Sequence, residues 1–294
     1  MKRIGALSLV FALAAVVIAA RAQTAKDLVL TTADGPRHAI VYAADSGPGP
    51  TVIVLHGHLG SGAQTARSTG FVDAARKRGF AVVFPDGLKR QWNDGRRGGE
   101  TDGPDDVAFL RALAERLITD GVAQRGRIYF AGISNGGMMS FTMACEAPDL
   151  VAGLGTVIAT LPAGLPRCAP GPMPVVMFNG TADPMVPFAG GEVGLRGGRG
   201  DVWGAERTAA LFAKVDGCGS SRAAPVPHRD ATETTTVDRI AWTGCRPGTE
   251  VALYRVNGGG HAYYGRPPLA FGLLGATNHD VDPADIILAA FAGR

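Results

Sequence analysis

Two short apolar runs, over residues 51–55 and 80–84, constrain the fold of this chain more than any other feature. Uninterrupted runs of this length, rich in valine, are typical of strands that are buried on both faces of a parallel sheet. Each is followed by an amphipathic segment, 63–78 after the first and 104–119 after the second, which we expect to be helical. Strands that alternate with helices predict an α/β fold, in which a mostly parallel central sheet is flanked by helices.

The rest of the chain continues this alternation. The further elements that we expect are an opening hairpin of strands 28–32 and 39–43, strands 127–131, 174–178 and 251–256, and helices 135–147, 205–214 and 283–291. The glycine-rich stretch 190–204 is expected to be a loop or a small insertion. Because no repeat and no long linker interrupts the pattern, we expect one domain over residues 23–294.

The first 22 residues have the features of a secretory signal peptide. Lys2 and Arg3 precede an apolar run over residues 4–20, and Ala20-Arg21-Ala22 supplies small residues around a cleavage site after Ala22. The alternative is an uncleaved anchor, because an apolar run of this length approaches that of a membrane span. We expect cleavage, and therefore a soluble mature protein that is secreted or periplasmic and does not bind a membrane.

The charge of the chain argues against some classes of partner. Its formal charge is +3, and the three basic residues of the first 22 account for all of it, since 26 basic and 26 acidic side chains remain. A balanced chain lacks the electrostatic surface that nucleic acid or an anionic membrane requires. No such partner is expected, and the oligomeric state is not predicted.

Four cysteines lie in the mature part of the chain: Cys145, Cys168, Cys218 and Cys245. An even number of cysteines in an exported protein predicts disulfides, and four cysteines allow three pairings. We expect the pairing of nearest neighbours, which closes two short loops. The spacing of these cysteines matches no zinc site, so neither a metal nor a redox role is expected.

The sequence Gly132-Ile133-Ser134-Asn135-Gly136 contains the pattern Gly-x-Ser-x-Gly. It follows the expected strand 127–131 and opens the expected helix 135–147, which is the setting in which the pattern presents a serine nucleophile on a sharp turn. The hydroxyl of Ser134 would then project at the carboxyl end of the sheet, beside the N–H groups of the helix N-terminus. The alternative is a glycine-rich turn without chemistry.

A serine nucleophile needs a histidine base and a carboxylate that orients the histidine, and in such folds they follow the serine in the order acid, then histidine. His261 lies beyond the expected strand 251–256, and Asp183 lies beyond strand 174–178. We therefore predict Ser134, Asp183 and His261 as a catalytic triad, although Asp183 could instead form an Asx-type turn. The other candidates after the serine follow no expected strand: His228, His279, Asp201, Asp216, Asp230 and Asp238.

Backbone N–H groups are the expected donors to a reacting oxyanion. Asn135 supplies one because it follows the nucleophile, and His58, just beyond the strand 51–55, supplies the other, with Leu59 as the alternative. His56 and His58 could also be half of a metal site, but no third ligand stands at a suitable spacing. No metal and no cofactor is expected.

These motifs, in order, are a strand followed by His-Gly, then Gly-Ile-Ser-Asn-Gly-Gly, Asn-Gly-Thr-Ala-Asp and Gly-Gly-Gly-His. Together they resemble the α/β-hydrolase superfamily, and more narrowly the secreted polyhydroxybutyrate depolymerase and feruloyl esterase group of carbohydrate esterases. The resemblance covers about residues 51–291 and places the triad of that group on Ser134, Asp183 and His261. It also supports pairing Cys218 with Cys245.

The chain departs from this group at two places. His58 stands where the group commonly has cysteine, and Ala262-Tyr263-Tyr264 stands where it commonly has tryptophan and proline after the histidine. We expect Tyr263 and Tyr264 to form one wall of a substrate site and Trp92 the opposite wall. A small ester or an oligomer is therefore at least as good a candidate substrate as a crystalline polyester.

The function that these features predict is a secreted serine esterase. It would hydrolyse carboxylic esters, either hydroxyalkanoate oligomers or polyesters or feruloyl and other aryl esters, through an acyl-enzyme. The alternatives are a hydrolase-fold serine peptidase and a non-catalytic binding protein that has kept the fold.

Overall fold

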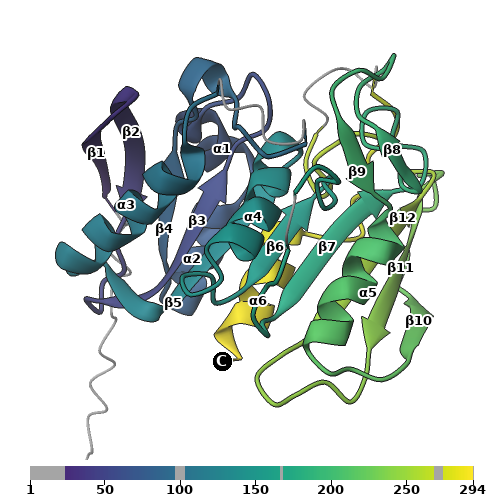
Figure 1. The fold of residues 1–294 in the computed structure, drawn as a ribbon. Helices are drawn as coiled ribbons and strands as arrows, with labels where there is room; N and C mark the ends of the chain where they lie inside the picture. Colours follow the sequence, from purple (N-terminus) through teal and green to yellow (C-terminus); the bar gives the residue numbers. More distant parts are fainter. Residues whose placement is uncertain (1–23, 97–102, 166–167, 268–273, 294) are drawn as a thin grey trace, which may run out of the picture.

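The computed structural model describes residues 24–96, 103–165, 168–267 and 274–293. Within these residues, ten strands form one sheet in the order β1-β2-β4-β3-β5-β6-β7-β12-β11-β10 (Figure 1). The central strands of this sheet are parallel: β4 (Ala81–Pro85), β3 (Gly49–Leu55), β5 (Ala123–Ile133), β6 (Leu154–Val157), β7 (Val175–Gly180) and β12 (Val251–Asn257). The predicted mostly parallel sheet is thereby confirmed.

Antiparallel strands complete both edges of the sheet. The hairpin of β1 (Ala25–Thr32) and β2 (Gly35–Tyr42) joins one edge, as the sequence predicts. The other edge, formed by β11 (Thr236–Trp242) and β10 (Ser221–Pro225), was not predicted. Edge strands present one face to solvent and carry polar residues, so they lack the continuous apolar runs that mark the central strands.

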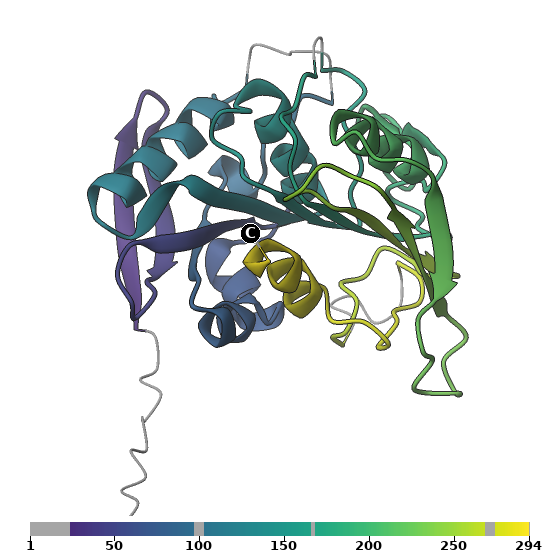
Figure 2. The same ribbon diagram turned by 90° about the horizontal axis from the view of Figure 1, so that it is seen from below.

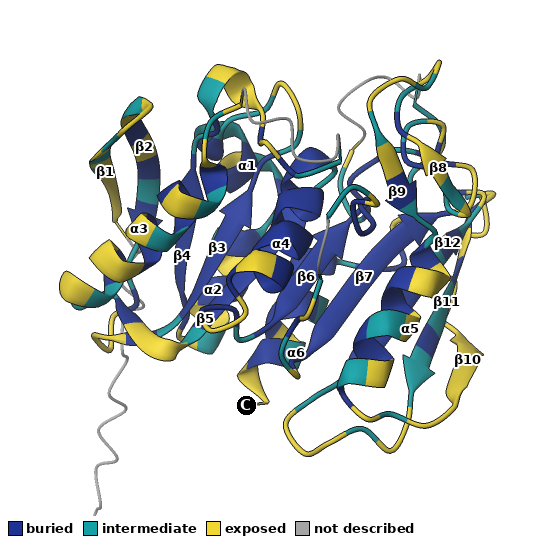
Figure 3. Ribbon diagram, in the orientation of Figure 1, coloured by how far each residue is buried: buried dark blue, intermediate teal, exposed yellow. Residues whose placement is uncertain are grey.

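Helices cover both faces of the sheet (Figures 2 and 3). On one face lie α3 (Asp106–Thr119), α4 (Asn135–Glu146) and α5 (Ala205–Val215), and on the other lie α1 (Gly62–Ser68), α2 (Phe71–Arg78) and α6 (Pro283–Ala292). The side chains of β3 alternate between the two layers, because Ile53 and Leu55 join the first core whereas Val52 and Val54 join the second. This alternation explains why the run 51–55 is apolar without interruption.

The helix expected over residues 63–78 is instead two helices. Helix α1 ends at Ser68, and α2 begins at Phe71 after Gly70, whose φ of +79° is in the left-handed region that glycine favours. The amphipathic pattern continues through the break, so the sequence alone did not reveal it. Similarly, the stretch 190–204 contains a small hairpin of β8 (Gly190–Glu192) and β9 (Asp201–Trp203).

Both expected disulfides form. Cys145 at the end of α4 is bonded to Cys168, and Cys218 after α5 is bonded to Cys245 in the loop between β11 and β12. No helix within the described residues is long and apolar enough to span a membrane. The signal peptide that we expect over residues 1–22 lies outside the described residues.

Removal of one disulfide should destabilise the protein without changing its fold. The two bridges span 23 and 27 residues, and restriction of the unfolded chain by loops of this length contributes about 3 kcal/mol each. We expect Cys218→Ala/Cys245→Ala to lower the free energy of unfolding in urea by about this amount. An unchanged urea midpoint, or free thiols at all four positions in the exported protein, would contradict the prediction.

Candidate active site

The carboxyl ends of the parallel strands meet at one edge of the sheet (Figure 1). Ser134, Asp183 and His261 follow β5, β7 and β12 in the chain. Ser134 stands between β5 and α4, with φ 51° and ψ −120°. These angles are strained for a residue other than glycine, and such strain is common where a side chain must be held for chemistry. The N–H of Ser134 donates to the carbonyl oxygen of Val157 at 2.9 Å, so the neighbouring strand β6 holds the turn.

The glycines of the motif allow this turn to be so tight. A Cβ atom on Gly136 would lie 2.4 Å from the carbonyl oxygens of Leu55 and His56, and one on Gly132 would lie 2.3 Å from the carbonyl oxygen of Gly136. All three obstacles are backbone atoms, which cannot rotate away as side chains can. The pattern Gly-x-Ser-x-Gly is therefore required here by packing of the backbone around Ser134.

Ser134, His261 and Asp183 lie in one hydrogen-bonded chain. The Nε2 atom of His261 is 3.0 Å from Oγ of Ser134, and its Nδ1 atom is 2.8 Å from Oδ2 of Asp183. The other carboxylate oxygen of Asp183 accepts the N–H groups of Met185 and Val186, at 2.7 and 2.8 Å. Asp183 therefore makes an Asx-type turn, which the sequence analysis considered as the alternative to a catalytic role. Its second carboxylate oxygen is nevertheless hydrogen-bonded to His261.

The two other candidate histidines are bonded elsewhere. His228 pairs with Asp280, and His279 pairs with Glu233. Of the three histidines that follow Ser134 in the chain, the structure brings only His261 to hydrogen-bond distance of the serine hydroxyl.

In the loop after β3, the two candidate oxyanion donors His58 and Leu59 differ in whether the backbone N–H already has a partner. The N–H of Leu59 donates to the carbonyl oxygen of Arg90 at 2.8 Å, and Leu59 is 59% exposed. That amide is already engaged, whereas the backbone N–H of His58 has no partner among the described residues. Asn135 is the first residue of α4, so its N–H has no partner within the helix.

Both ring nitrogens of His56 are hydrogen-bonded to the backbone around this loop. Its Nε2 atom accepts the N–H of Gly87 at 2.9 Å, so the proton is on Nδ1, which donates to the carbonyl oxygen of Gly57 at 2.8 Å. Burial lowers the pKa of His56, and the hydrogen bond to Gly57 opposes this only in part, which favours the neutral ring. Within the described residues, no three side chains are grouped in a way that could hold a metal ion.

The side chain of Asn135 makes a clamp that the sequence analysis missed. Its Oδ1 atom accepts the N–H of Trp92 at 2.8 Å, while Nδ2 donates to the carbonyl oxygen of Trp92 and to Oδ2 of Asp94, at 2.9 and 2.6 Å. All three residues are buried, and Asn135 lies more than 40 positions from Trp92 and from Asp94 in the chain. No local sequence signal announces such a contact, because it depends on how β4 and β5 are placed side by side with β3.

A cavity of about 620 Å³ opens above Ser134 and His261. Trp92 and Tyr263 line it, as expected for substrate walls, although both are largely buried and hydrogen-bonded. The indole Nε1 atom of Trp92 donates to the carbonyl oxygen of His56, and the hydroxyl of Tyr263 donates to that of Thr69. Both rings that line the cavity are therefore held in place by a hydrogen bond to the backbone.

Tyr264 does not belong to this wall, so its predicted substrate-binding role is wrong. It is fully buried in the core beneath α6, and its hydroxyl donates to the carbonyl oxygen of Gly260 at 2.9 Å. Of two consecutive aromatic residues, only Tyr263 faces the cavity, whereas Tyr264 supports the loop that carries His261.

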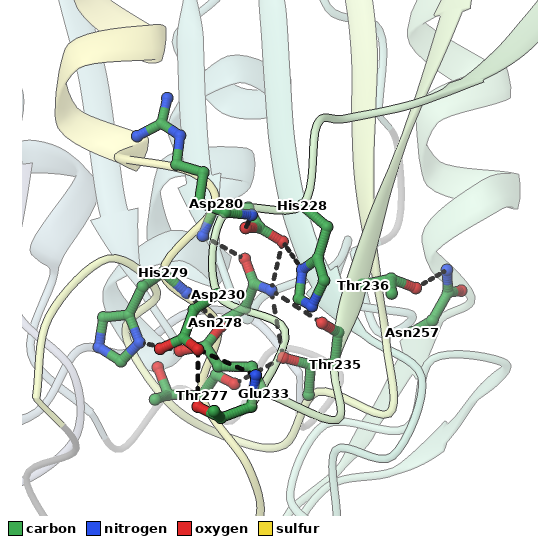
Figure 4. A network of polar contacts seen from close by, with 12 residues as sticks. His228, Asp230, Glu233, Thr235, Thr236, Asn257, Thr277, Asn278, His279 and Asp280 are labelled. Carbon is green, nitrogen blue, oxygen red and sulfur yellow. Dashed lines mark hydrogen bonds and ion pairs between the residues drawn. The ribbon is translucent and has the colours of Figure 1, made fainter.

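A second polar network joins the segments around His228 and Asp280 (Figure 4). The Nδ1 atom of His228 is 2.8 Å from Oδ2 of Asp280, whose carboxylate also accepts from the backbone N–H of Arg229 and from Nδ2 of Asn278. The Asp280 carboxylate raises the pKa of His228. Burial alone would raise the pKa of Asp280, but the hydrogen bonds outweigh it and lower that pKa.

The stability of the protein should depend on pH through His228. A histidine whose folded pKa is raised contributes stability below its unfolded pKa of 6.5, and this contribution is lost as pH rises through the folded pKa. Asp280 stays charged throughout this window because its folded pKa is lowered. We expect the Tm difference between the wild type and His228→Gln to be larger at about pH 6 than at about pH 8.

His38→Gln provides the control, since His38 is an exposed histidine on β2. Its Tm difference from the wild type should not share this dependence. Equal Tm differences for His228→Gln at both pH values would contradict the prediction.

Comparison with known proteins agrees with the fold and extends it to function. No family model matches the chain. The chain is 31% identical to the "putative esterase NocK" of Nocardia uniformis subsp. tsuyamanensis over 80% of its length and 72% of that protein. It is 29% identical to feruloyl esterase B of Piromyces equi over 72% of its length, but spans only 39% of that longer protein.

Among solved structures, acetyl xylan esterase from Aspergillus awamori shares the fold, with a TM-score of 0.57 and 15% identity. The similarity covers 92% of this chain and all of that one. The fold is therefore that of the α/β-hydrolases. The similarity to NocK shows that the chain belongs to a family of esterases with this fold. It is a carboxylic ester hydrolase related to feruloyl esterases.

Proposed function

We propose that the protein is a secreted serine esterase in which Ser134 is the nucleophile, His261 the general base and Asp183 the residue that orients the base. The hydrogen-bonded chain from Ser134 Oγ through His261 to Asp183, in which Ser134 and His261 line the cavity, is the observation that carries this proposal. With its Nδ1 proton donated to Asp183, His261 is left with an unprotonated Nε2 atom that accepts the serine proton.

Acylation begins when Oγ of Ser134 attacks the ester carbonyl carbon and its proton moves to Nε2 of His261. The carbonyl oxygen becomes an oxyanion, which the backbone N–H groups of His58 and Asn135 stabilise. The tetrahedral intermediate then collapses: the bond to the alcohol oxygen breaks, and His261 returns the proton to the departing alcohol. An acyl-enzyme on Ser134 remains.

Deacylation repeats these steps with water. His261 takes a proton from the water molecule, the hydroxide attacks the acyl carbon, and the proton passes to Oγ of Ser134 as the acid leaves. The clamp of Asn135 on Trp92 and Asp94 supports both halves of the reaction, because it keeps the first turn of α4 and its oxyanion donor in place.

The substrates that we propose are hydroxyalkanoate oligomers or feruloyl and other aryl esters. The cavity of about 620 Å³ is mostly apolar and has the rings of Trp92 and Tyr263 in its wall. Such a cavity suits a hydroxyacyl or aryl acyl group. The feruloyl esterases among the relatives support the aryl alternative. Secretion is supported by the disulfides, which form and persist in oxidising compartments.

A fluorophosphonate probe tests the nucleophile directly. It should phosphonylate the native protein at Ser134, as located by peptide mass spectrometry, and should leave Ser134→Ala unlabelled. Hydrolysis of 4-nitrophenyl acyl esters, methyl ferulate and hydroxybutyrate oligomers would then rank the substrate classes. An inert Ser134 would favour the non-catalytic binding protein, and cleavage of peptides but not esters would favour the peptidase.

A further inference from the structure

The cavity above Ser134 contains two arginines that the proposed reaction does not use. Arg96 and Arg199 both line it, and among its described lining residues there is no aspartate or glutamate. In a cavity otherwise walled by side chains such as Trp92, Val186 and Val193, two guanidinium groups without a lining carboxylate require an explanation. A ligand that is itself negatively charged would provide one.

Arg96 is held in place from behind. Its Nε atom is 2.8 and 2.9 Å from the two carboxylate oxygens of Asp94, which is buried and also accepts from Nδ2 of Asn135 at 2.6 Å. The Nη1 and Nη2 atoms of Arg96 make no hydrogen bond to any described residue. Asp94 thus fixes the guanidinium through one edge and leaves its terminal nitrogens for a partner in the cavity.

Arg199 reaches the mouth of the cavity from the hairpin of β8 and β9. Its backbone N–H donates to the carbonyl oxygen of Val193, and the N–H of Val193 donates to that of Gly200. Val193 and Val202 pack into a small core with Met138 of α4, so the hairpin has a fixed position. The Arg199 side chain has no ion pair with any described residue, and the hairpin carboxylates Glu192 and Asp201 do not line the cavity.

Arg96 and Arg199 both lie close to His58. After the effect of burial, the positive charges of Arg199 and Arg96 are what lower the pKa of His58, in that order. Both charges are therefore close to the residue whose backbone N–H is the proposed oxyanion donor. The two segments also meet directly, since a Cβ on Gly200 would lie 2.8 Å from the carbonyl oxygen of Arg96.

We propose that Arg199 and Arg96 form a binding subsite for a second, anionic group of the ester, so that the preferred substrate carries a free carboxylate beside the bond that is cleaved. This proposal rests on ester hydrolysis at Ser134. It favours oligomers of hydroxy acids, which end in a carboxylate, over feruloyl esters of neutral sugars. Arginine suits this role because its planar nitrogens match the two oxygens of a carboxylate.

The test compares two esters that differ in one terminal group, mono-4-nitrophenyl glutarate and 4-nitrophenyl pentanoate. Their acyl chains have the same number of carbons. The free carboxylate of the glutarate ester can attack its own ester carbonyl and displace 4-nitrophenolate, so the rate without enzyme is subtracted for each ester, and comparison of wild type with variant cancels the remaining difference in intrinsic reactivity. The quantity measured is the ratio of kcat/KM for the anionic ester to kcat/KM for the neutral ester. We expect Arg199→Ala to lower this ratio by about tenfold or more, as for loss of a charge-assisted hydrogen bond.

Arg196→Ala is the matched control, because Arg196 lies on the same hairpin, is exposed and does not line the cavity. It removes the same charge and should leave the ratio unchanged. A second pair, 4-acetoxybenzoate and its methyl ester, places the carboxylate on the alcohol side and shows which part of the ester the arginines bind. An equal fall of the ratio in both variants, or no fall with either pair, would overturn the proposal.

A binding measurement separates this proposal from the esterase mechanism. Calorimetric titration of the Ser134→Ala variant, which should not turn the esters over, should show tighter binding of mono-4-nitrophenyl glutarate than of 4-nitrophenyl pentanoate, and the additional substitution Arg199→Ala should abolish the difference. Equal binding of the two esters refutes the anionic subsite whatever the wild-type activity is. Selective anion binding without any wild-type hydrolysis would instead refute the esterase mechanism and leave the subsite standing.

Discussion

Ser134→Ala should abolish ester hydrolysis, lowering kcat by about four to six orders of magnitude. The loss should be this large because the nucleophile, base and acid of a triad act as a unit, and no other serine hydroxyl lies against Nε2 of His261 among the described residues. The melting temperature should change little, since the substitution removes one oxygen atom from a residue that is only partly buried. Steady-state hydrolysis of 4-nitrophenyl butyrate and a thermal melt measure both quantities.

A pair of histidine variants controls for indirect effects. His261→Gln should lose activity on a similar scale, whereas His228→Gln should retain it, because His228 is bonded to Asp280 (Figure 4) and makes no hydrogen bond to Ser134. Retention of more than about a tenth of the wild-type kcat by Ser134→Ala would refute the assignment of the nucleophile.

The parts of this site that the sequence could predict are those that follow from chain order. The turn at Ser134, and the positions of Asp183 and His261 beyond strands β7 and β12, depend on each strand delivering its next residues to the same edge of the sheet. A buried parallel strand is recognisable as an apolar run, so the edge could be located in advance.

Features that depend on contacts between distant loops could not be predicted in this way. Our proposal of His58 over Leu59 as oxyanion donor depends on the carbonyl oxygen of Arg90, which accepts the N–H of Leu59. Likewise, Tyr263 and Tyr264 have the same side chain and adjacent positions, yet only the first lines the cavity. Neither difference can be predicted from the composition or periodicity of the sequence, because each depends on how distant loops pack against one another.

The buried ion pair of Arg37 and Asp106 is another contact between distant segments, and it holds the chain next to Trp92 in place. Nη2 of Arg37 is 2.6 Å from Oδ1 of Asp106, and the N–H of Asn93 donates to Oδ2 of the same carboxylate at 2.7 Å. Asn93 lies between Trp92 and Asp94, the two residues that Asn135 clamps. The pair therefore links the hairpin strand β2 and the start of α3 to the segment that holds Asn135, the proposed oxyanion donor.

Burial raises the pKa of Asp106 despite its hydrogen bonds from Asn93 and Arg37, so the surroundings disfavour its charged form. An ion pair of this kind contributes little net stability, but removal of one partner leaves the other charge buried and uncompensated. Arg37→Met should accordingly lower the free energy of unfolding by about 3 to 5 kcal/mol, and Asp106→Asn by a similar amount.

The double variant Arg37→Met/Asp106→Asn should recover most of this loss, because it removes both charges while the new amide oxygen still accepts the N–H of Asn93. Urea unfolding of the four proteins completes a double-mutant cycle, and we expect a coupling energy of several kcal/mol. The exposed pair Arg116 and Asp120, whose side chains are 49% and 36% exposed, provides the matched cycle, with an expected coupling below about 1 kcal/mol. Destabilisations that simply add in the buried cycle would show that Arg37 acts through its contact with Phe109 and not through its ion pair with Asp106.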